Sequence, residues 1–461
     1  MPSNSYWLQG RAQRFDQLRG ETRADVTIVG GGIAGLTAAY LLSCAGVEVA
    51  VLEARTIGSG ATGHTTAHLT SQHGLVWDTR IRRFGFDAAK RIAMANEGAI
   101  GLVAGIAREE GIDCDLQIVE SHIFTDDYKL EKTIEQEAEA ASRLGIMADV
   151  VSRSKFLLPY AVALRFQRQA MFHPFKYING LADAALRGNA RIYEQSRVLH
   201  IEDGLVRTAD GSVRARCIVV ATHIPVINFP GWYFSRLYQN RSYAVAVRGA
   251  PPLAGMWNSA DTGGYTYRTH GDMLVISGGD HRCGTETGID HYASLQRHIT
   301  AMFPQAQAEH FWSAQDAMTL DGLPYVGRYS AKSNNLFVAT GFGKWGMTQG
   351  SLAGMILSDM ILDKHHEYTD IYSPQRTVLP ITVGEAARQN AVTAWHLMSG
   401  MVKLKNPRCA HMKCKLEWNA DDQTWDCPCH GSRFDPEGNV LETPSIHGIE
   451  QPGMDNSTRN G

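Results

Sequence analysis

A glycine cluster between two apolar runs limits what this chain can fold into. Residues 25–53 read DVTIVGGGIAGLTAAYLLSCAGVEVAVLE, which is an apolar run, a helical pattern and a second apolar run ending in an acid. This order predicts a strand, a helix and a second strand. Gly30, Gly32 and Gly35 occupy the positions of G-x-G-x-x-G, which serve a tight turn, close approach of backbone to a pyrophosphate, and helix-on-strand packing. The stretch therefore predicts a dinucleotide site.

The helix and the acid of this unit add two specific expectations. The helix predicted from Ile33 to about Cys44 directs its free N–H groups and positive dipole end at the phosphates. Glu53, at the end of the second strand, is placed to accept hydrogen bonds from the ribose hydroxyls of an adenosine. The motif does not choose between NAD and FAD, because both cofactors place an adenosine diphosphate here.

Size and charge narrow the class of protein. A chain of 461 residues is too long for one compact core, so two or three domains are expected. The net charge of −3 argues against a nucleic-acid or anionic-membrane partner. We find neither an apolar run of about 18 residues nor a signal-peptide core, so we expect a cytoplasmic protein without a membrane span.

Three further segments resemble the cofactor motifs of one family. They read GSGATGHTTAHLT at 58–70, DGLPYVG at 321–327 and NLFVATGFGKWGMTQG at 335–350. Together with the glycine motif, they make residues 5–362 similar to the D-amino-acid oxidase and glycine oxidase (DAO) superfamily of FAD enzymes. The resemblance implies FAD instead of NAD. It also implies an α/β fold with a Rossmann-like FAD-binding domain and an antiparallel-sheet substrate domain.

The flavin-facing loop has a physical rationale of its own. Gly341, Gly343 and Gly346 let the backbone approach a planar ring, and the following helix dipole can stabilise negative charge on a reduced flavin. The full set of predicted cofactor-binding residues is Gly30, Gly32, Ile33, Ala34, Gly35, Glu53, Ala54, Ala61, Thr62, Gly63, His64, Val198, Gly341, Gly343, Trp345, Gly346, Met347 and Thr348.

The resemblance also sets the expected domain boundaries. The oxidoreductase covers residues 1–365, followed by a connector at 366–400 with a helix from Gly384 to about His396, and a last domain at 401–461. FAD-binding parts are expected at about 1–90, 170–230 and 320–365, and substrate-binding parts at about 91–169 and 231–319. Periodicity predicts helices at 88–110 and 130–144, and the resemblance implies a helix at 173–188. Apolar runs predict buried strands at 198–201 and 217–223.

Alternating polar and apolar residues at 231–319 predict a separate antiparallel sheet, which in the resembling family forms a roof over the flavin. The polar candidates on it are Tyr265, Tyr267, Arg268 and His281, although a residue of this kind, taken singly, is more often structural than catalytic. Arg268 is of interest because a substrate carboxylate needs a bidentate cation. Lys344, in the flavin-facing loop, is a candidate for stabilising anionic reduced flavin; the alternative is a solvated surface lysine.

Cysteine and histidine gather near the C-terminus in two short boxes. CAHMKC begins at Cys409 and CPCHGS begins at Cys427. Their number and spacing permit a structural zinc site, a surface disulfide loop or a Rieske [2Fe-2S] centre, in which two loops each give one Cys and one His. Trp418 and Asn419 before the second box, and SRFDPEGNVL in and after it, resemble the Rieske family.

The Rieske resemblance implies the roles of individual residues. It makes Cys409 and Cys427 the thiolate ligands and His411 and His430 the imidazole ligands of the cluster. It also places Cys414 and Cys429 where one branch of the family has a disulfide between the cluster loops. In the family the two histidines are exposed at the tip of the domain, where electrons would leave.

Two departures from the Rieske pattern carry predictions. Only about a dozen residues separate the connector helix from Cys409, so the base of the domain is abbreviated and the cluster loops should pack against the flavoprotein body. Phe434 stands where high-potential members carry a tyrosine that donates to a ligand sulfur. Because such a hydrogen bond favours the reduced cluster, we predict a lower reduction potential here.

His64 permits two interpretations. It follows Glu53 by eleven residues, which matches the position of a covalent FAD linkage in dimethylglycine and sarcosine dehydrogenase relatives. The local sequence TGHTT differs from their motif, so the alternative is a histidine that contacts the flavin or pyrophosphate without a covalent bond.

Together these features predict an FAD-dependent dehydrogenase that oxidises a C–N bond of an amine or amino acid. The cluster takes one electron at a time, which implies export to an external one-electron carrier, ferredoxin-like or similar. Two alternatives stay open. In one, a ferredoxin feeds the cluster and the flavin reduces an unsaturated substrate; in the other, the protein is a non-catalytic redox carrier or sensor.

Overall fold

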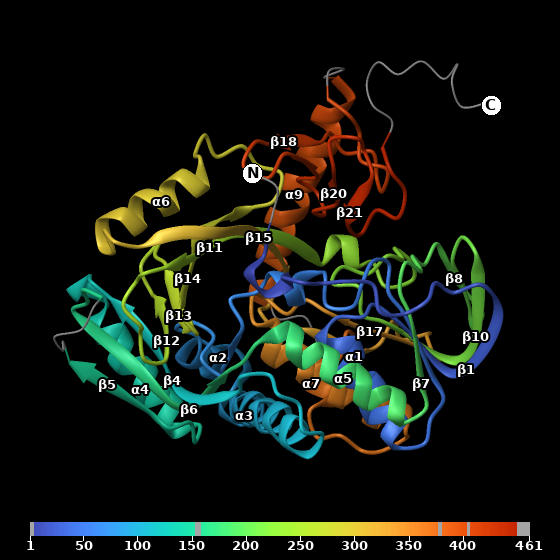
Figure 1. Ribbon diagram of the computed structural model, residues 1–461, viewed down its shortest axis with the longest axis horizontal. Helices are drawn as coiled ribbons and strands as arrows, with labels where there is room; N and C mark the ends of the chain where they lie inside the picture. The colour runs from blue at the N-terminus through green and yellow to red at the C-terminus, as the bar shows by residue number, and fades with distance from the viewer. Residues whose placement is uncertain (1–3, 153–157, 377–379, 403–405, 450–461) are drawn as a thin grey trace.

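The computed structural model describes residues 4–152, 158–376, 380–402 and 406–449 (Figure 1). The expected last domain at 401–461 therefore includes two stretches, 403–405 and 450–461, that lie outside the described residues. Figure 1 shows one sheet with its helices at the lower right, a second sheet above and to the left, and a small red domain on top. Within the described ranges, no helix combines the length and apolar character needed to cross a membrane.

The first sheet is a parallel sheet built around the predicted glycine motif. Along its main path, β16-β17-β10-β1-β2-β7, only β16 runs antiparallel to its neighbour. Strand β2 reads VAVL and is buried along its whole length, as expected for a parallel strand covered on both faces. The bounds are β1 Gly20–Val29, β2 Val49–Leu52, β7 Ala190–Tyr193, β10 Gly211–Val220, β16 Tyr325–Arg328 and β17 Leu336–Thr340.

One predicted strand of this sheet is wrong. Residues 198–201 were expected to form a buried strand, but the structure has the short pair β8 (His200–Glu202) and β9 (Leu205–Arg207), which attaches to β10. Asp203 and Gly204 both have positive φ and turn the chain back after three residues. Val198 is buried ahead of this hairpin.

Helices cover the first sheet. Helix α7 (Gly346–Ile361) packs on α1 (Ile33–Cys44) and α3 (Phe86–Glu109), and α5 (Pro174–Arg187) packs on α1. The approach of α7 to α1 is close, because a Cβ on Gly354 would lie 2.6 Å from the Cβ of Thr37. The helices predicted at 88–110, 130–144 and 173–188 are confirmed as α3, α4 (Glu131–Arg143) and α5.

The predicted roof is confirmed, and it extends further than expected. Its order is β15-β11-β14-β13-β12-β4-β6-β3, with β5 beside β6, so segments from both predicted substrate-binding parts share one sheet. Helix α6 packs on β11 and β14 of this sheet. The bounds are β3 His68–Leu69, β4 Gln117–Thr125, β5 Ala148–Ser152, β6 Val162–Met171, β11 Leu237–Arg248, β12 Met256–Ser259, β13 Thr266–His270, β14 Met273–Arg282, β15 Gln307–Thr319, α2 Trp77–Phe84 and α6 His291–Met302.

The C-terminal part consists of a long helix and a small sheet. The predicted connector helix is confirmed as α9 (Pro380–Val402), which is longer than the expected 384–396 and follows the short α8 (Thr369–Tyr372). Figure 1 shows α9 in orange, running beside the roof up to the red domain. The four-stranded antiparallel sheet comprises β18 Glu417–Asn419, β19 Thr424–Asp426, β20 Arg433–Phe434 and β21 Val440–Glu442.

Candidate functional site

A cavity of about 500 Å³ lies between the parallel sheet and the roof. Its walls come from the glycine turn after β1, the loop at 53–66, the underside of the roof and the loop that precedes α7. Residues of the C-terminal domain close it as well: Leu441, Glu442, Thr443 and Ile446. Three parts of the chain that are far apart in sequence therefore share one cavity.

The glycine turn has the geometry that its motif requires. Gly30 has φ +113°, and a Cβ there would lie 2.4 Å from the carbonyl oxygen of Ala221. A Cβ on Gly35 would lie 2.1 Å from the carbonyl oxygen of Gly30. The backbone N–H groups of Gly31 and Arg55 donate to the two carboxylate oxygens of Glu53, at 2.8 and 2.9 Å. These bonds hold the Glu53 carboxylate at the edge of the cavity.

Most of the predicted cofactor residues reach the cavity, and four do not. The four that do not line the cavity are Gly35, Gly63, Gly341 and Thr348. Tight packing or a hydrogen bond accounts for the residue type at these positions. A Cβ on Gly341 would lie 2.3 Å from Thr319, and Thr348 Oγ1 donates to the Thr70 carbonyl at 2.9 Å. The predicted residues that line the cavity are Gly30, Gly32, Ile33, Ala34, Glu53, Ala54, Ala61, Thr62, His64, Val198, Gly343, Trp345, Gly346 and Met347.

Of the four catalytic candidates, the structure brings only Lys344 to the cavity. Arg268 is fully buried, and it donates to the backbone carbonyls of Ala67 at 2.6 Å and Phe172 at 2.9 Å. The expected role of Arg268 as a carboxylate anchor is therefore not supported, because its guanidinium is used to fix the chain beside β3. Burial lowers the pKa of Arg268 to about 9.

Tyr267 and His281 also point elsewhere. Side chains alternate along a strand, so Tyr267 lies on the opposite face of β13 from its neighbour Thr266, which lines the cavity. The Tyr267 hydroxyl lies 2.6 Å from His298 of α6. The His281 ring stacks on Tyr243 and its Nδ1 lies 3.1 Å from the Gly279 carbonyl. These two residues therefore stabilise the outer side of the roof.

Two carboxylates of the roof that line the cavity were missed by the sequence reasoning. Asp280 follows the GG pair near the end of β14, and its carboxylate lies 2.7 Å from Lys344 Nζ. Asp316 faces the cavity from β15, and burial raises the pKa of its carboxyl to about 7, although Lys344 opposes the rise. The alternating sequence QDAMT at 315–319 predicts a strand with two different faces. A single strand does not show which of its faces lines the cavity.

The C-terminal domain brings the four predicted cluster ligands together in two pairs, the thiols in one and the imidazoles in the other. Cys409 and Cys427 are buried free thiols, and Cys427 donates to Cys409, which lowers the pKa of Cys409 to about 7. The rings of His411 and His430 have centroids 5.1 Å apart and stand almost perpendicular. Nδ1 of His411 and both ring nitrogens of His430 are buried with no hydrogen-bond partner among the described residues. Two thiolates and two imidazoles with free nitrogens fit a Rieske cluster.

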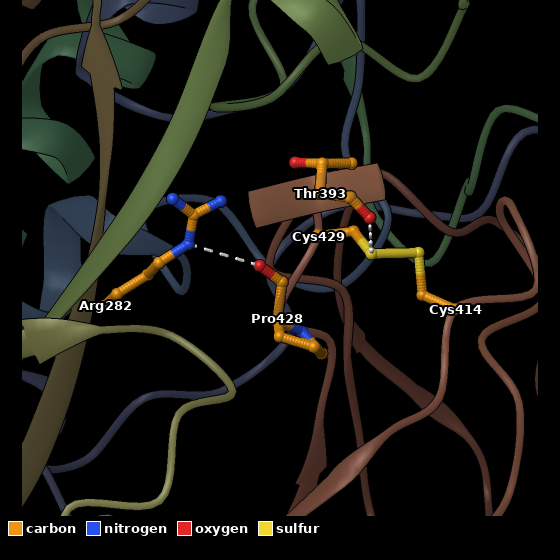
Figure 2. Close-up of a disulfide and its surroundings, with 5 residues drawn as sticks. All are labelled: Arg282, Thr393, Cys414, Pro428 and Cys429. Atoms are coloured by element: carbon orange, nitrogen blue, oxygen red, sulfur yellow. Dashed lines mark hydrogen bonds between the residues drawn. A yellow bond between two sulfur atoms is a disulfide. The ribbon is translucent and has the colours of Figure 1, made fainter. Parts of the chain in front are cut away.

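A disulfide joins the two cluster loops (Figure 2). The sulfur atoms of Cys414 and Cys429 are 2.12 Å apart, and both lie within 4.8 Å of the Cys427 sulfur. Cys429 Sγ is 3.9 Å from the Thr393 carbonyl oxygen of α9, and Arg282 Nε donates to the Pro428 carbonyl at 3.4 Å (Figure 2). The connector helix and the roof thus support the loop that carries Cys427 and His430.

The cluster loops pack on the outer face of the roof, as the abbreviated base predicted. Gln239 donates to the His430 carbonyl and Gln315 to the Gly431 carbonyl, both at 2.9 Å. A Cβ on Gly431 would lie 2.5 Å from the Gln239 side chain, so this contact requires glycine. Along β15, Gln315 faces the cluster loops and the next residue, Asp316, faces the cavity. The pair β11 and β15 therefore separates the two sites by the thickness of one sheet.

The expectation that both histidines are exposed at a domain tip is wrong. His430 is only 2% exposed, and Phe234 packs edge-on against it with ring centroids 6.0 Å apart. Nε2 of His411 lies 2.7 Å from Asn228 Oδ1, which also belongs to the flavoprotein body. The histidine side of the domain is turned inward because the segment at 224–237 covers it.

The fold and the two sites define a class: an FAD-dependent oxidoreductase that carries a Rieske [2Fe-2S] domain. The family model for FAD dependent oxidoreductases (DAO) matches residues 25–360, and the model for the Rieske [2Fe-2S] domain matches residues 374–452. The chain belongs to the DAO family, whose flavoenzymes act on amines and amino acids, and it binds FAD and a [2Fe-2S] cluster.

Three similar proteins show how far the likeness extends. YhfW of Bacillus subtilis (strain 168), described as a Rieske 2Fe-2S iron-sulfur protein, is 33% identical over 98% of this chain and 98% of its own length. Gamma-glutamylputrescine oxidoreductase of Escherichia coli (strain K12) is 27% identical and covers 75% of this chain and 85% of its own length. The crystal structure of glycine oxidase from Geobacillus kaustophilus superposes with a TM-score of 0.67, at 21% identity, over 77% of this chain and 100% of its own.

Proposed function

We propose that this protein is a dehydrogenase that oxidises a C–N bond of an amine or amino acid and exports the electrons through its Rieske cluster to a one-electron carrier. The observation that carries the proposal is the shared wall: β21 and the residues after it, in the domain that holds the cluster ligands, also line the FAD cavity. A domain that merely accompanied the oxidoreductase would have no reason to close its cofactor cavity.

The residues of this chain have distinct tasks in the proposed reaction. When bound, FAD supplies the acceptor for a hydride from the carbon next to nitrogen. Glu53 and the glycine turn hold the adenosine diphosphate end, and the roof covers the cavity and excludes water. Burial lowers the pKa values of His64, His68 and His223 in the cavity wall, so these imidazoles are neutral and can serve as hydrogen-bonding groups.

The contact between the domains supports an electron path between the two sites. Gln239 lies beside His223, which lines the FAD cavity, and donates to the carbonyl of His430. Gln315 bonds to Gln239 at 3.0 Å. These amides form a short, buried connection from the cavity wall to a cluster-ligand residue. Such a connection suits electron transfer because packed and hydrogen-bonded atoms couple better than a water-filled gap.

Anaerobic mixing tests the proposal. The protein is mixed with a panel of secondary amines, N-methyl amino acids and D-amino acids while the flavin absorbance is recorded, followed by low-temperature EPR. We expect one compound to bleach the flavin, with a Rieske EPR signal appearing afterwards. A Cys427→Ser variant, which lacks one cluster ligand, should still bleach but give no Rieske signal. The proposal is wrong if no compound bleaches the flavin while a reduced ferredoxin reduces both centres. Electrons would then pass from the cluster to the flavin.

A further inference from the structure

The underside of the roof consists mainly of small and uncharged residues. From β11, β13 and β14 the cavity receives Ser242, Ala244, Thr266 and Ser277, none of which carries a charge. Among the described residues, the charged side chains that reach the cavity on this side are Asp280, Asp316, Lys344 and, from the C-terminal domain, Glu442. Glu442 lies 3.8 Å from Arg433, so the other two carboxyls face one ammonium in the part of the cavity that the roof covers.

Lys344, the cavity-lining lysine, already forms an ion pair. Lys344 Nζ is 2.7 Å from Asp280, so this pair is close to neutral. The Asp316 carboxyl has no ion-pair partner in the described parts of the chain. The two arginines in the described cavity wall, Arg55 and Arg197, stand at the other end, where the backbone around them binds Glu53. A cation that enters beneath the roof therefore meets an uncompensated, desolvated carboxyl.

An amino-acid carboxylate finds no comparable partner. Recognition of a carboxylate normally uses an arginine fork or another positioned cation. Arg268 of β13 does not line the cavity, and its guanidinium already donates to backbone carbonyls. A carboxylate placed beneath the roof would instead lie near Asp280 and Asp316, and like charges in a low-dielectric cavity repel strongly.

We propose that the substrate of this site is a cationic amine without a carboxylate on the carbon that is oxidised, and that Asp316 binds its ammonium group. This inference rests on the proposed function and narrows its substrate class. The proton balance is simple: the substrate ammonium gives one proton to the Asp316 carboxylate and leaves a neutral amine, whose C–H hydride the flavin can accept. The raised pKa of Asp316 supports this task, because a carboxylate that titrates near pH 7 can accept a proton from a bound ammonium.

Matched pairs of compounds test the inference. Putrescine is compared with ornithine, cadaverine with lysine, and dimethylamine with sarcosine, so that each pair differs by one carboxylate. We expect flavin bleaching by at least one amine and none by its carboxylated partner. Bleaching by the amino acid at an equal or higher rate overturns the inference but keeps the proposed function. Bleaching by none of these compounds or of the wider amine and amino-acid panel overturns both.

A binding measurement separates Asp316 from a general effect on the fold. Tert-butylammonium has N–H donors but no hydrogen on the carbon next to nitrogen, so it can bind Asp316 but cannot be oxidised. It is titrated into the holoenzyme and followed by the shift in the flavin spectrum. Asp316→Asn should weaken this binding by about 10- to 100-fold, the range of a lost charge-assisted hydrogen bond. Asp316→Glu should restore part of it. Asp272→Asn, at an exposed turn of the roof, is the matched control and should not change the affinity. Equal affinities in the wild type and Asp316→Asn would contradict the assignment.

Discussion

A buried ion cluster should determine whether the Rieske domain stays on the roof. Arg241 of β11 is fully buried, and its guanidinium lies 2.7 Å from Asp422 and 3.0 Å from Asp426 of the C-terminal domain. Arg433 contacts Asp422 from the other side at 2.8 Å. Arg241→Met keeps most of the volume but leaves two buried carboxylates facing one arginine. Removing one partner of a buried pair typically destabilises by about 3–5 kcal/mol.

Urea unfolding of the holoprotein measures this effect. The visible circular dichroism of the cluster reports the C-terminal domain, and flavin fluorescence reports release of FAD. With a slope of about 2 kcal/mol per molar urea, a loss of that size moves the midpoint of the cluster signal by about 2 M. The flavin signal should shift as well, because residues of the C-terminal domain line the FAD cavity.

Arg248→Met is the matched control for this prediction. Arg248 belongs to the same strand, but its side chain is 50% exposed and pairs with Glu309 at the surface. Exposed pairs contribute little because water and salt screen them, so the midpoint should barely move. If Arg241→Met shifted the midpoint no further than Arg248→Met, the cluster would not hold the domains together.

The pH dependence of the same cluster has a defined sign. Burial alone would raise the pKa of Asp422, but the guanidinium groups of Arg433 and Arg241 lower it to about 2. Because the pKa is lower in the folded protein than in the unfolded chain, this carboxylate stabilises the fold above about pH 4. We expect the stabilisation to be lost as the pH falls from about 4 towards 2, and to be smaller in Arg241→Met.

Three further predictions concern the cofactors. In Gly35→Ala, a Cβ 2.1 Å from the Gly30 carbonyl oxygen should displace the glycine turn, so the purified variant should contain much less FAD by absorbance. Phe434→Tyr adds a hydroxyl in the core beside Cys409 and Cys427 and should raise the cluster potential in a redox titration. Burial raises the pKa of Asp316 to about 7, and this carboxyl must be ionised to bind an ammonium group. The rate of flavin reduction by an amine should therefore rise with pH through about 7. The Asp316→Asn variant should not show this rise.

The covalent state of FAD at His64 has a simple assay. The imidazole Nδ1 lies 2.9 Å from the Gly60 carbonyl in the cavity wall, an arrangement that suits a hydrogen-bonding residue. We expect acid precipitation to leave all the yellow colour in the supernatant. Yellow colour in the pellet would instead favour the covalent linkage.

Local motifs made much of this protein readable in advance. The glycine turn, the acid after β2 and the loop before α7 are short segments that line the cavity, so their spacing alone was enough to predict a cofactor site. The same holds for Cys409 with His411 and for Cys427 with His430, because each loop supplies both of its predicted ligands. The helices α3 and α4 were predictable from periodicity because each buries one face.

The orientation of the roof was decided only by the tertiary structure. Arg268 was predicted to face the substrate and Asp316 was not considered, because which of the two reaches the cavity depends on strand pairing and on the chain around Ala67. The inward turn of His430 likewise depends on Gln239, Gln315 and the 224–237 segment, which are distant in sequence. By itself, the sequence determined which cofactors the protein binds. The packing of one domain on another determined what faces them, because those contacts join residues that no local pattern connects.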